Sequence, residues 1–405
     1  MPGWHALTEP HRKAGHLKVV GILQEQHPDR CALFMQWKQM DWPVWLDALN
    51  LLQLPAVPYT LLVDENGRIE SVNPTQEAFL AFMEKPARET ELQSSQPWDR
   101  SPEWKMPRLP SDEALDVSAW LEAGQGFFQG AWSSHSMTCL KAFQQALLLE
   151  PENGWIHFRL GVVYGRLFDE DPSQPMPLFA RAISHWKQAL ALDPNQYIWR
   201  RRLQQYGPRL DKPYAFYDWI DAARSELLAR GETPLPLKVE PSGAEIAKPI
   251  KDGNFEVTPA SMPDPDGRVQ RAAPGLMEWR HVTVSHTQRE RRSIRVHMQW
   301  QPAANSSVEW NNEAEPLTLW LEAAPGWKVQ PAFIQVPGPP MAHDREVRSL
   351  EFECQASEDA AALEIRGVAL FSICESSGGP CLYRRLDWVL SHADLFPQQA
   401  PPLLP

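Results

Sequence analysis

The stretch LPAVPYTLLVDENGRI, residues 54–69, decides the fold of the first part of the chain. Its Asn66-Gly67 pair predicts a tight hairpin turn, because both turn positions need positive φ. The apolar run 59–63 before the turn predicts a strand that is covered on both faces. Pro58 cannot donate a backbone hydrogen bond, so it must stand at the first strand position or on an edge. The peptide bond before a proline is also the only kind of peptide bond that adopts the cis form at low cost.

The sequence around this hairpin alternates strand patterns with helix patterns. It predicts strands over 17–23 and 42–46 and helices over 30–40, 47–54 and 75–84. Strands that alternate with helices form layers with parallel strands. Residues 1–85 are therefore expected to form an α/β domain.

Val57-Pro58-Tyr59-Thr60 and the D-E-N-G-R-I run at 64–69 resemble segments of the thioredoxin-like redoxins of the TlpA and AhpC/TSA type. In that family a V-P-x-T segment carries a cis proline beside the active site, and a D-x-x-G-x-I hairpin follows. The predicted element order resembles the family's order with its first strand missing. The alternative is an ordinary β-hairpin that begins with a proline.

The resemblance implies a thiol oxidoreductase with antioxidant activity, thiol or disulfide protein partners, no cofactor and an extracytoplasmic, periplasmic location. Redoxins open a helix with a C-P-G-C-H turn, and the chain begins with Met1-Pro-Gly-Trp-His. The match places Met1 and Trp4 where the family has thiols, and without a thiolate at a helix N-terminus dithiol exchange cannot run there. By the same resemblance, the groove of this site is lined by Pro2, Gly3, Trp4, Val57 and Pro58.

Three explanations for the missing thiols stay open. The chain starts late and lacks an upstream strand with a cysteine or selenocysteine, the domain is a degenerate redoxin kept for binding, or the N-terminal match is chance. The first is favoured, because a sheet without an internal strand leaves backbone groups unpaired. The N-terminus shows neither the charged region nor the apolar region of a signal peptide.

Length and composition bound the remaining possibilities. A chain of 405 residues suggests two or three domains. The formal charge of −12 argues against nucleic acid or an anionic membrane as the main partner. No apolar run approaches the roughly 18 residues of a membrane span. Five cysteines are too few for a disulfide scaffold, and the histidines lack metal-site spacing, so neither a metal nor another cofactor is predicted.

A proline-rich linker is predicted over 86–115, and the pattern then changes to a period of 3.6 over 116–230. Two self-similar segments, AFxxALxLxPEN at 142–153 and AIxxWxxALxLxPN at 182–195, resemble tetratricopeptide repeats. The resemblance implies paired helices that serve as a rigid spacer or bind peptides. A plain helical bundle is the alternative. The basic cluster 199–202 is interpreted as a solvated helix face.

A second linker is predicted over 231–275, and residues 276–396 then alternate with period two, which predicts an antiparallel β-sandwich. Near its end, Cys374 and Cys381 flank a glycine-rich loop between two strands. This part resembles the N-terminal immunoglobulin-like domain of DsbD-type reductases, in which a cysteine pair at such a loop passes electrons to partners. The family's loop is shorter and is followed by prolines that are absent here. Redox activity, a structural disulfide and two reduced cysteines all stay open.

The expected fold is therefore multidomain: a thioredoxin-like α/β domain lacking its first strand, tetratricopeptide-like helical repeats and an all-β immunoglobulin-like sandwich. The favoured function is a thiol-disulfide oxidoreductase-type protein or redox partner that is inactive at its N-terminal site. The alternative is a non-catalytic scaffold that binds peptides on the helical repeats.

Overall fold

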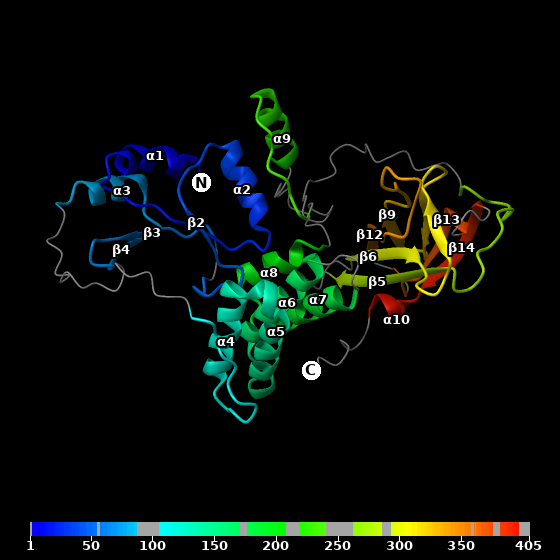
Figure 1. Ribbon diagram of the computed structural model, residues 1–405, viewed down its shortest axis with the longest axis horizontal. Coiled ribbons are helices and arrows are strands. Elements are labelled where there is room, and N and C mark those ends of the chain that lie inside the picture. The colour runs from blue at the N-terminus through cyan, green and yellow to red at the C-terminus, as the bar shows by residue number, and fades with distance from the viewer. Residues whose placement is uncertain are drawn as a thin grey trace.

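The computed structural model describes most of the chain, in ten ranges. These are residues 2–54, 57–86, 105–170, 176–207, 219–239, 262–285, 293–357, 360, 362–375 and 381–396. Along the chain an α/β module is followed by an array of helices and then by a module of antiparallel sheets (Figure 1). The protein is thus multidomain with mixed α and β structure.

The N-terminal module contains short strands and three helices. Its elements are α1 (Pro2–Lys13), β1 (Gly21–Leu23), α2 (Pro28–Trp37), β2 (Val44–Leu46), β3 (Leu61–Val63), β4 (Ile69–Val72) and α3 (Gln76–Met83). β1 pairs with β2 in parallel, and β3 pairs with β4 in an antiparallel hairpin. Within the described residues these are two separate two-stranded sheets. The alternation of strands and helices was predicted, but a single α/β sheet is not formed.

The hairpin strand is less buried than its apolar sequence predicts. Leu62 is buried, whereas Leu61 and Val63 are 42% and 47% exposed. The expectation of a strand covered on both faces is therefore wrong. The reason is that β3 pairs only with β4, so one face of this two-stranded sheet packs inward and the other stays open.

The helix predicted over 47–54 is also wrong, because this segment forms turns. The side chain of Asp47 accepts hydrogen bonds from the backbone N–H groups of Leu51 and Leu52. Asn50 adopts φ of 49° and bonds the backbone of Leu54 through its side-chain amide. Asp and Asn side chains compete with the helix in this way by bonding nearby backbone groups.

The middle of the chain is helical. Its elements are α4 (Val117–Gly130), α5 (Trp132–Leu149), α6 (Gly154–Glu170), α7 (Met176–Leu192), α8 (Tyr197–Gln204) and α9 (Trp219–Ala229). α6 and α7 approach closely where Gly161 faces Trp186, since an added Cβ at Gly161 would lie 2.3 Å from the indole nitrogen. α9 stands apart from α4–α8 and packs against α2 through Leu33 and Leu227 (Figure 1).

The C-terminal module consists of antiparallel strands. They are β5 (Met277–Ser285), β6 (Ser293–Pro302), β7 (Val308–Asn311), β8 (Leu317–Ala323), β9 (Trp327–Gln330), β10 (Phe333–Val336), β11 (His343–Asp344), β12 (Arg348–Ala356), β13 (Ile365–Glu375) and β14 (Cys381–Leu390), followed by α10 (His392–Leu395). One sheet has the order β10-β8-β13-β7-β11, with β14 added on β13, and the other has the order β5-β6-β12-β9. Trp300 and Phe352 of the second sheet share one core with Leu319 and Phe371 of the first.

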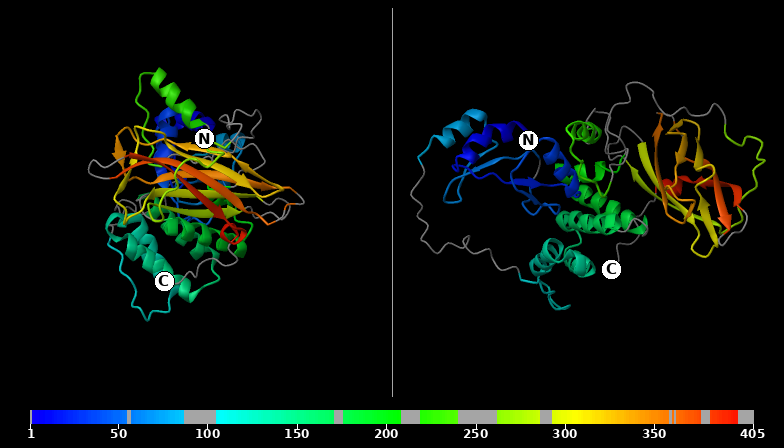
Figure 2. Two further views of the ribbon diagram at one scale, coloured as in Figure 1. Left: turned by 90° about the vertical axis from the view of Figure 1, so that its right-hand side faces the viewer. Right: turned by 45° about the horizontal axis from the view of Figure 1, so that its top comes forward.

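The helical array lies between the other two modules (Figures 1 and 2). Its hydrophobic core includes Ala48 and Leu49 from the N-terminal module and Val282 and Val284 from β5. Residues far apart in the sequence are thus buried in one cluster, and the array contacts both flanking modules.

Candidate functional site

The residues that the sequence assigns to an N-terminal groove are mostly exposed. Pro2 and Gly3 begin α1 and face solvent, and an added Cβ at Gly3 would meet nothing within 4 Å. Trp4 is half-buried, and its ring packs edge-on against Phe79 of α3 at a centroid distance of 5.6 Å. The position matched to the family's second thiol is thus occupied by an indole ring. Met1, matched to the nucleophilic thiol, lies outside the described residues.

The other two groove residues lie before β3. The Val57–Pro58 peptide bond is cis, and both side chains are exposed. Thr60 closes the hairpin beyond them, because its N–H donates to the side chain of Asn73 and its carbonyl accepts the N–H of Asn73. None of the five residues assigned to the groove carries a nucleophilic side chain.

The second assigned site is a disulfide between Cys374 and Cys381. The two residues are directly opposed where β13 and β14 meet, with their Cα atoms 3.9 Å apart. On its other side Cys374 is paired with Glu309 of β7. Cys374 is only 5% exposed, whereas Cys381 is exposed, so the bond joins a buried residue to an exposed one. The loop 376–380 that joins them lies outside the described residues.

The remaining three cysteines are free thiols, and burial makes them poor nucleophiles. Burial raises the pKa of Cys139 and of Cys354 to about 12. Cys31 is half-buried in α2, where it lines an apolar pocket of about 210 Å³ beside β1, and burial raises the pKa of its thiol. Cys381 of the hairpin disulfide is accordingly the one cysteine of the five that is exposed.

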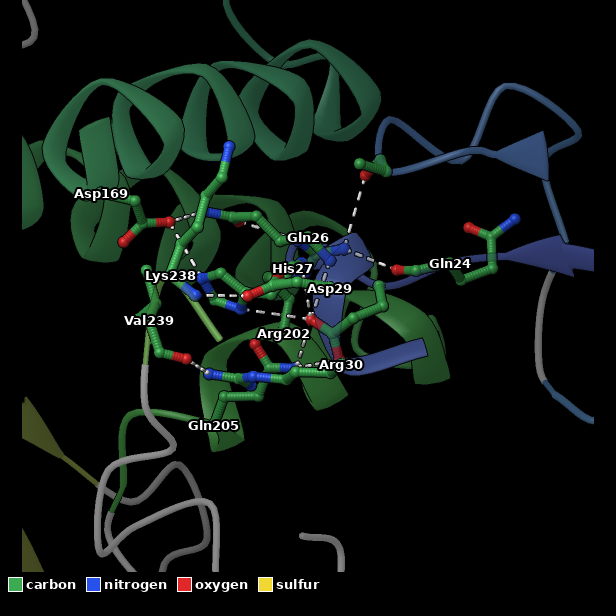
Figure 3. A network of polar contacts seen from close by, with 12 residues as sticks. Gln24, Gln26, His27, Asp29, Arg30, Asp169, Arg202, Gln205, Lys238 and Val239 are labelled. Carbon is green, nitrogen blue, oxygen red and sulfur yellow. Dashed lines mark hydrogen bonds and ion pairs between the residues drawn. The ribbon is translucent and has the colours of Figure 1, made fainter. Parts of the chain in front are cut away.

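A network of polar contacts joins the segment after β1 to the helical array (Figure 3). Asp169 of α6 accepts hydrogen bonds at its Oδ2 atom from Gln26 at 2.8 Å and from the His27 ring at 3.0 Å. The other ring nitrogen of His27 lies 3.5 Å from Oε1 of Glu25. Burial favours the neutral ring, but the hydrogen bond to Asp169 and the ion-pair contact with Glu25 outweigh it and raise the pKa of His27 to about 9.

The second part of this network comes from α8. Arg202 is 2% exposed and donates to Oε1 of Gln26 at 2.8 Å, to the carbonyl oxygen of Gln24 at 2.7 Å and to that of Ala48 at 3.5 Å. Burial raises the pKa of Glu25, but the hydrogen bond from His27 and the charge of Arg202 outweigh it and lower that pKa far below its ordinary value. These contacts fix residues 24–30 across the ends of α6 and α8.

The network reaches a third segment. Arg30 donates to the carbonyl oxygen of Val239 at 3.3 Å, and the Asp29 carboxylate accepts the N–H of Lys238. Figure 3 shows these contacts beside those of His27 and Arg202. The chain that follows α9 is therefore attached to the same junction.

Sequence reasoning missed this junction. The interpretation of residues 199–202 as a solvated face is wrong, because Trp199 and Arg202 are both almost fully buried. The available signal was their spacing of three, which places Arg202 on the same helix face as a tryptophan. A buried arginine needs acceptors, and nothing local in the sequence indicates that residues 24–48 supply them.

A second junction joins the helical array to the C-terminal module. Nε2 of His297 in β6 donates to the carbonyl oxygen of Tyr206 at 2.6 Å, and its ring packs edge-on against Phe179 of α7. Its Nδ1 atom lies 3.1 Å from Glu351, which Arg295 also contacts at 2.9 Å. The array is thus attached to each flanking module through a buried histidine.

The part of the chain that the structure describes contains no helix long and apolar enough to cross a membrane. The same residues contain no group of three or more His, Cys, Asp or Glu side chains placed to hold a metal ion.

No protein-family model matches the chain, and no curated protein matches it. Among solved structures, a FixG-related protein from Vibrio parahaemolyticus is 10% identical, with a TM-score of 0.15, over 27% of this chain and 94% of that one. The yeast GGA1 GAE domain is 11% identical, with a TM-score of 0.16, over 29% of this chain and 94% of that domain. Neither likeness is close enough to support an argument about fold or function.

Proposed function

We propose that the chain is a thiol-disulfide exchange protein or redox partner whose working pair is Cys374 and Cys381. The thioredoxin-like, tetratricopeptide-like and immunoglobulin-like assignments belong to the same proposal. The observation that carries it is the unequal exposure of the two residues, since Cys381 is exposed and Cys374 is buried. Exchange needs an accessible sulfur to attack and a second sulfur to leave.

The reaction follows from this asymmetry. A thiolate of a partner dithiol attacks Sγ of Cys381, a mixed disulfide forms, and Cys374 leaves as a thiolate that takes up a proton. The second thiol of the partner then attacks the partner's first sulfur, which is bonded to Cys381 in the mixed disulfide. This forms the partner's disulfide and releases Cys381 as a thiol. The partner is oxidised and the pair is reduced by the same two electrons, so no further reactant is needed. The N-terminal module takes no part, since its groove residues carry no thiol.

Variants of the full chain that keep one cysteine of the pair test this order of attack. In a Cys31→Ser background, Cys374→Ser leaves an exposed Cys381 thiol and Cys381→Ser leaves a buried Cys374 thiol. We expect Cys374→Ser to form a mixed disulfide with 5,5′-dithiobis(2-nitrobenzoate) at least about tenfold faster, because access governs the rate. Equal rates would contradict the assigned roles.

Turnover is tested with reduced thioredoxin as the dithiol probe and insulin as the disulfide acceptor. We expect thioredoxin to reduce the pair, and the reduced chain to reduce insulin, in the wild-type protein but not in the Cys374→Ser variant. A pair that stays oxidised with thioredoxin, or a wild-type chain that leaves insulin oxidised, would exclude exchange activity.

The second candidate function is a non-catalytic scaffold, and the shared core favours it. Leu49 and Val284 come from different flanking modules and are both buried with the helical array. Residues 24–30 also cover the ends of α6 and α8, so a peptide on the repeats would need another face. Hydrogen exchange on the full chain tests this arrangement. The scaffold predicts strong protection of α6 and α8, and fast exchange there would count against it.

A further inference from the structure

We infer that the N-terminal module is held on the helical array by a releasable latch, in which the protonated His27 ring bridges Glu25 and Asp169 and releases the array when the ring loses its proton. The latch consists of Glu25, Gln26, His27, Asp169 and Arg202. It goes beyond the proposed exchange reaction, because none of these residues lies in the C-terminal module.

The geometry places a carboxylate beside each nitrogen of the His27 ring, through a hydrogen bond at Nε2 and a longer ion-pair contact at Nδ1. Nε2 of His27 lies 3.0 Å from Asp169 Oδ2, and Nδ1 lies 3.5 Å from Glu25 Oε1. Both neighbours are carboxylates, which only accept hydrogen bonds when ionised, and only the imidazolium carries N–H on both nitrogens. A neutral ring that keeps the bond to Asp169 turns a lone pair toward Glu25. The ring is 5% exposed, so water does not compensate for that loss.

Charged groups from three elements surround the ring. Asp169 of α6 and Glu25 of its own segment favour the imidazolium, whereas the positive charge of Arg30 in α2 opposes it. Arg202 of α8 acts on the nearby Glu25 and keeps that carboxyl ionised. The two direct contacts outweigh Arg30, because they are hydrogen bonds or close ion pairs to ionised groups.

The bridge spans two modules, so the charge of one ring affects how they dock. Asp169 belongs to α6, while Gln26 and His27 belong to the N-terminal segment. The apolar part of this junction consists of Ala48 and Leu49, which are buried in the array core, and of Leu51 and Leu54, which pack against it partly buried. Gln26 also packs against Gly165 of α6, where an added Cβ would lie 2.8 Å from its amide nitrogen. Release of this segment uncovers the ends of α6 and α8.

The pH window follows from the sign of the shift. The pKa of His27 is about 9 in the docked state, above the ordinary histidine value of 6.5. The contribution of the charged ring to docking is therefore complete below about pH 6.5 and is lost as the pH rises through about 9. A shift of this size changes the docking equilibrium on the order of a hundredfold. The latch stays closed at neutral pH and opens in alkali.

Distance measurement between two spin labels on the full chain tests the latch. Trp45 of β2 and Leu148 of α5 are 64% and 56% exposed and serve as labelling positions, as Trp45→Cys and Leu148→Cys in a Cys31→Ser background. We expect one narrow distance distribution at pH 7 and an added longer population at pH 10. His27→Gln keeps an amide donor for Asp169 but has no charge to lose, so the change between pH 7 and 10 should disappear. The control variant His16→Gln, at an exposed position of the same module, should still show the change between pH 7 and 10.

Identical distributions at pH 7 and 10 in the parent protein would overturn the latch. A pH-dependent change of equal size in the His27→Gln variant would also overturn the latch, since that change would arise from groups other than His27. If His27→Gln does not fold, Asp169→Asn tests the same contact from α6. It should move the transition to lower pH, because the ring loses an anionic partner, and a transition at unchanged pH would contradict the proposal.

Discussion

Arg202 of α8 donates a hydrogen bond to Oε1 of Gln26 at 2.8 Å, although 176 residues separate the two positions in the sequence. The guanidinium is buried, and its other acceptors are backbone carbonyl oxygens of the N-terminal module. A single side chain of the helical array therefore satisfies polar groups in two segments of another module. This contact makes the junction specific, because each of these groups would otherwise be buried without a partner.

Replacing Arg202 by methionine removes these donors while keeping most of the side-chain volume. We expect Arg202→Met to lower the free energy of unfolding by about 2–4 kcal/mol, because buried acceptors and Glu25 lose a charged partner. Urea denaturation measures the change. Arg200→Met is the matched control in the same helix, where the side chain is more exposed and bonds the carbonyl of Pro194. Equal losses in the two variants would show that the junction adds no stability.

The contact between Gly161 and Trp186 gives a prediction for the helical array. An added Cβ at Gly161 would lie 2.3 Å from the indole nitrogen of a fully buried ring. Overpacking costs about 1–3 kcal/mol and alanine regains roughly 1 kcal/mol as a helix former, so Gly161→Ala should destabilise the array by up to about 2 kcal/mol. Thermal unfolding followed by circular dichroism measures the effect.

Gly3 is the control position for this substitution. It also lies in a helix, but an added Cβ meets nothing within 4 Å. Gly3→Ala should leave the transition unchanged or raise it slightly. A stable Gly161→Ala variant would mean that the two helices separate without cost.

Local sequence patterns predicted the helices and turns that are determined by residues close to them in the chain. The cap residue Thr75 accepts the N–H of Ala78 and begins α3 where the sequence places it. The period of 3.6 located α4 to α8, and the Asn66-Gly67 pair located the hairpin of β3 and β4. The prediction of positive φ at both turn positions is wrong, because only Gly67 adopts it and the connection between the strands spans residues 64–68. Caps, turns and periodicity depend on neighbours within a few residues, so one sequence suffices to find them.

The two junctions could not be predicted from the sequence, because the residues that contact each other there are far apart in the chain. Nothing near His27 indicates that Asp169 lies beside it, and nothing near His297 indicates the carbonyl of Tyr206. The short strands β7, β10 and β11 cannot be located from the sequence for a related reason. A strand of two to four residues is defined by its partners more than by its own pattern.

The hairpin disulfide should stabilise the C-terminal module whether or not it exchanges. Cys374 and Cys381 are seven positions apart, and closing so short a loop contributes about 2.5 kcal/mol through the unfolded chain. The double variant Cys374→Ala/Cys381→Ala should lose this amount in urea denaturation. Cys31→Ala, which changes a half-buried free thiol, should lose clearly less. Loss of stability without loss of exchange, or the reverse, would separate the structural from the redox role of the pair.

Acid should weaken the second junction through Glu351. Burial raises the pKa of this carboxyl, but the charges and hydrogen bonds of His297 and Arg295 outweigh burial and lower it to about 2. A lowered pKa contributes stability that is complete above about pH 4.5 and is lost as the pH falls toward 2. Because the Glu351 side chain is 24% exposed, we expect a loss of about 1–3 kcal/mol over that range.

Urea denaturation of the full chain at pH 6, 4 and 2.5 measures this loss against two variants. Glu351→Gln should be less stable at pH 6 and should show a smaller decline between pH 4 and 2.5, since it has no carboxyl to protonate. Glu322→Gln, at an exposed position of β8, should follow the wild-type curve. The assignment fails if Glu351→Gln declines as steeply as the wild type, because the acid sensitivity of the C-terminal module would then come from carboxylates outside the His297 junction.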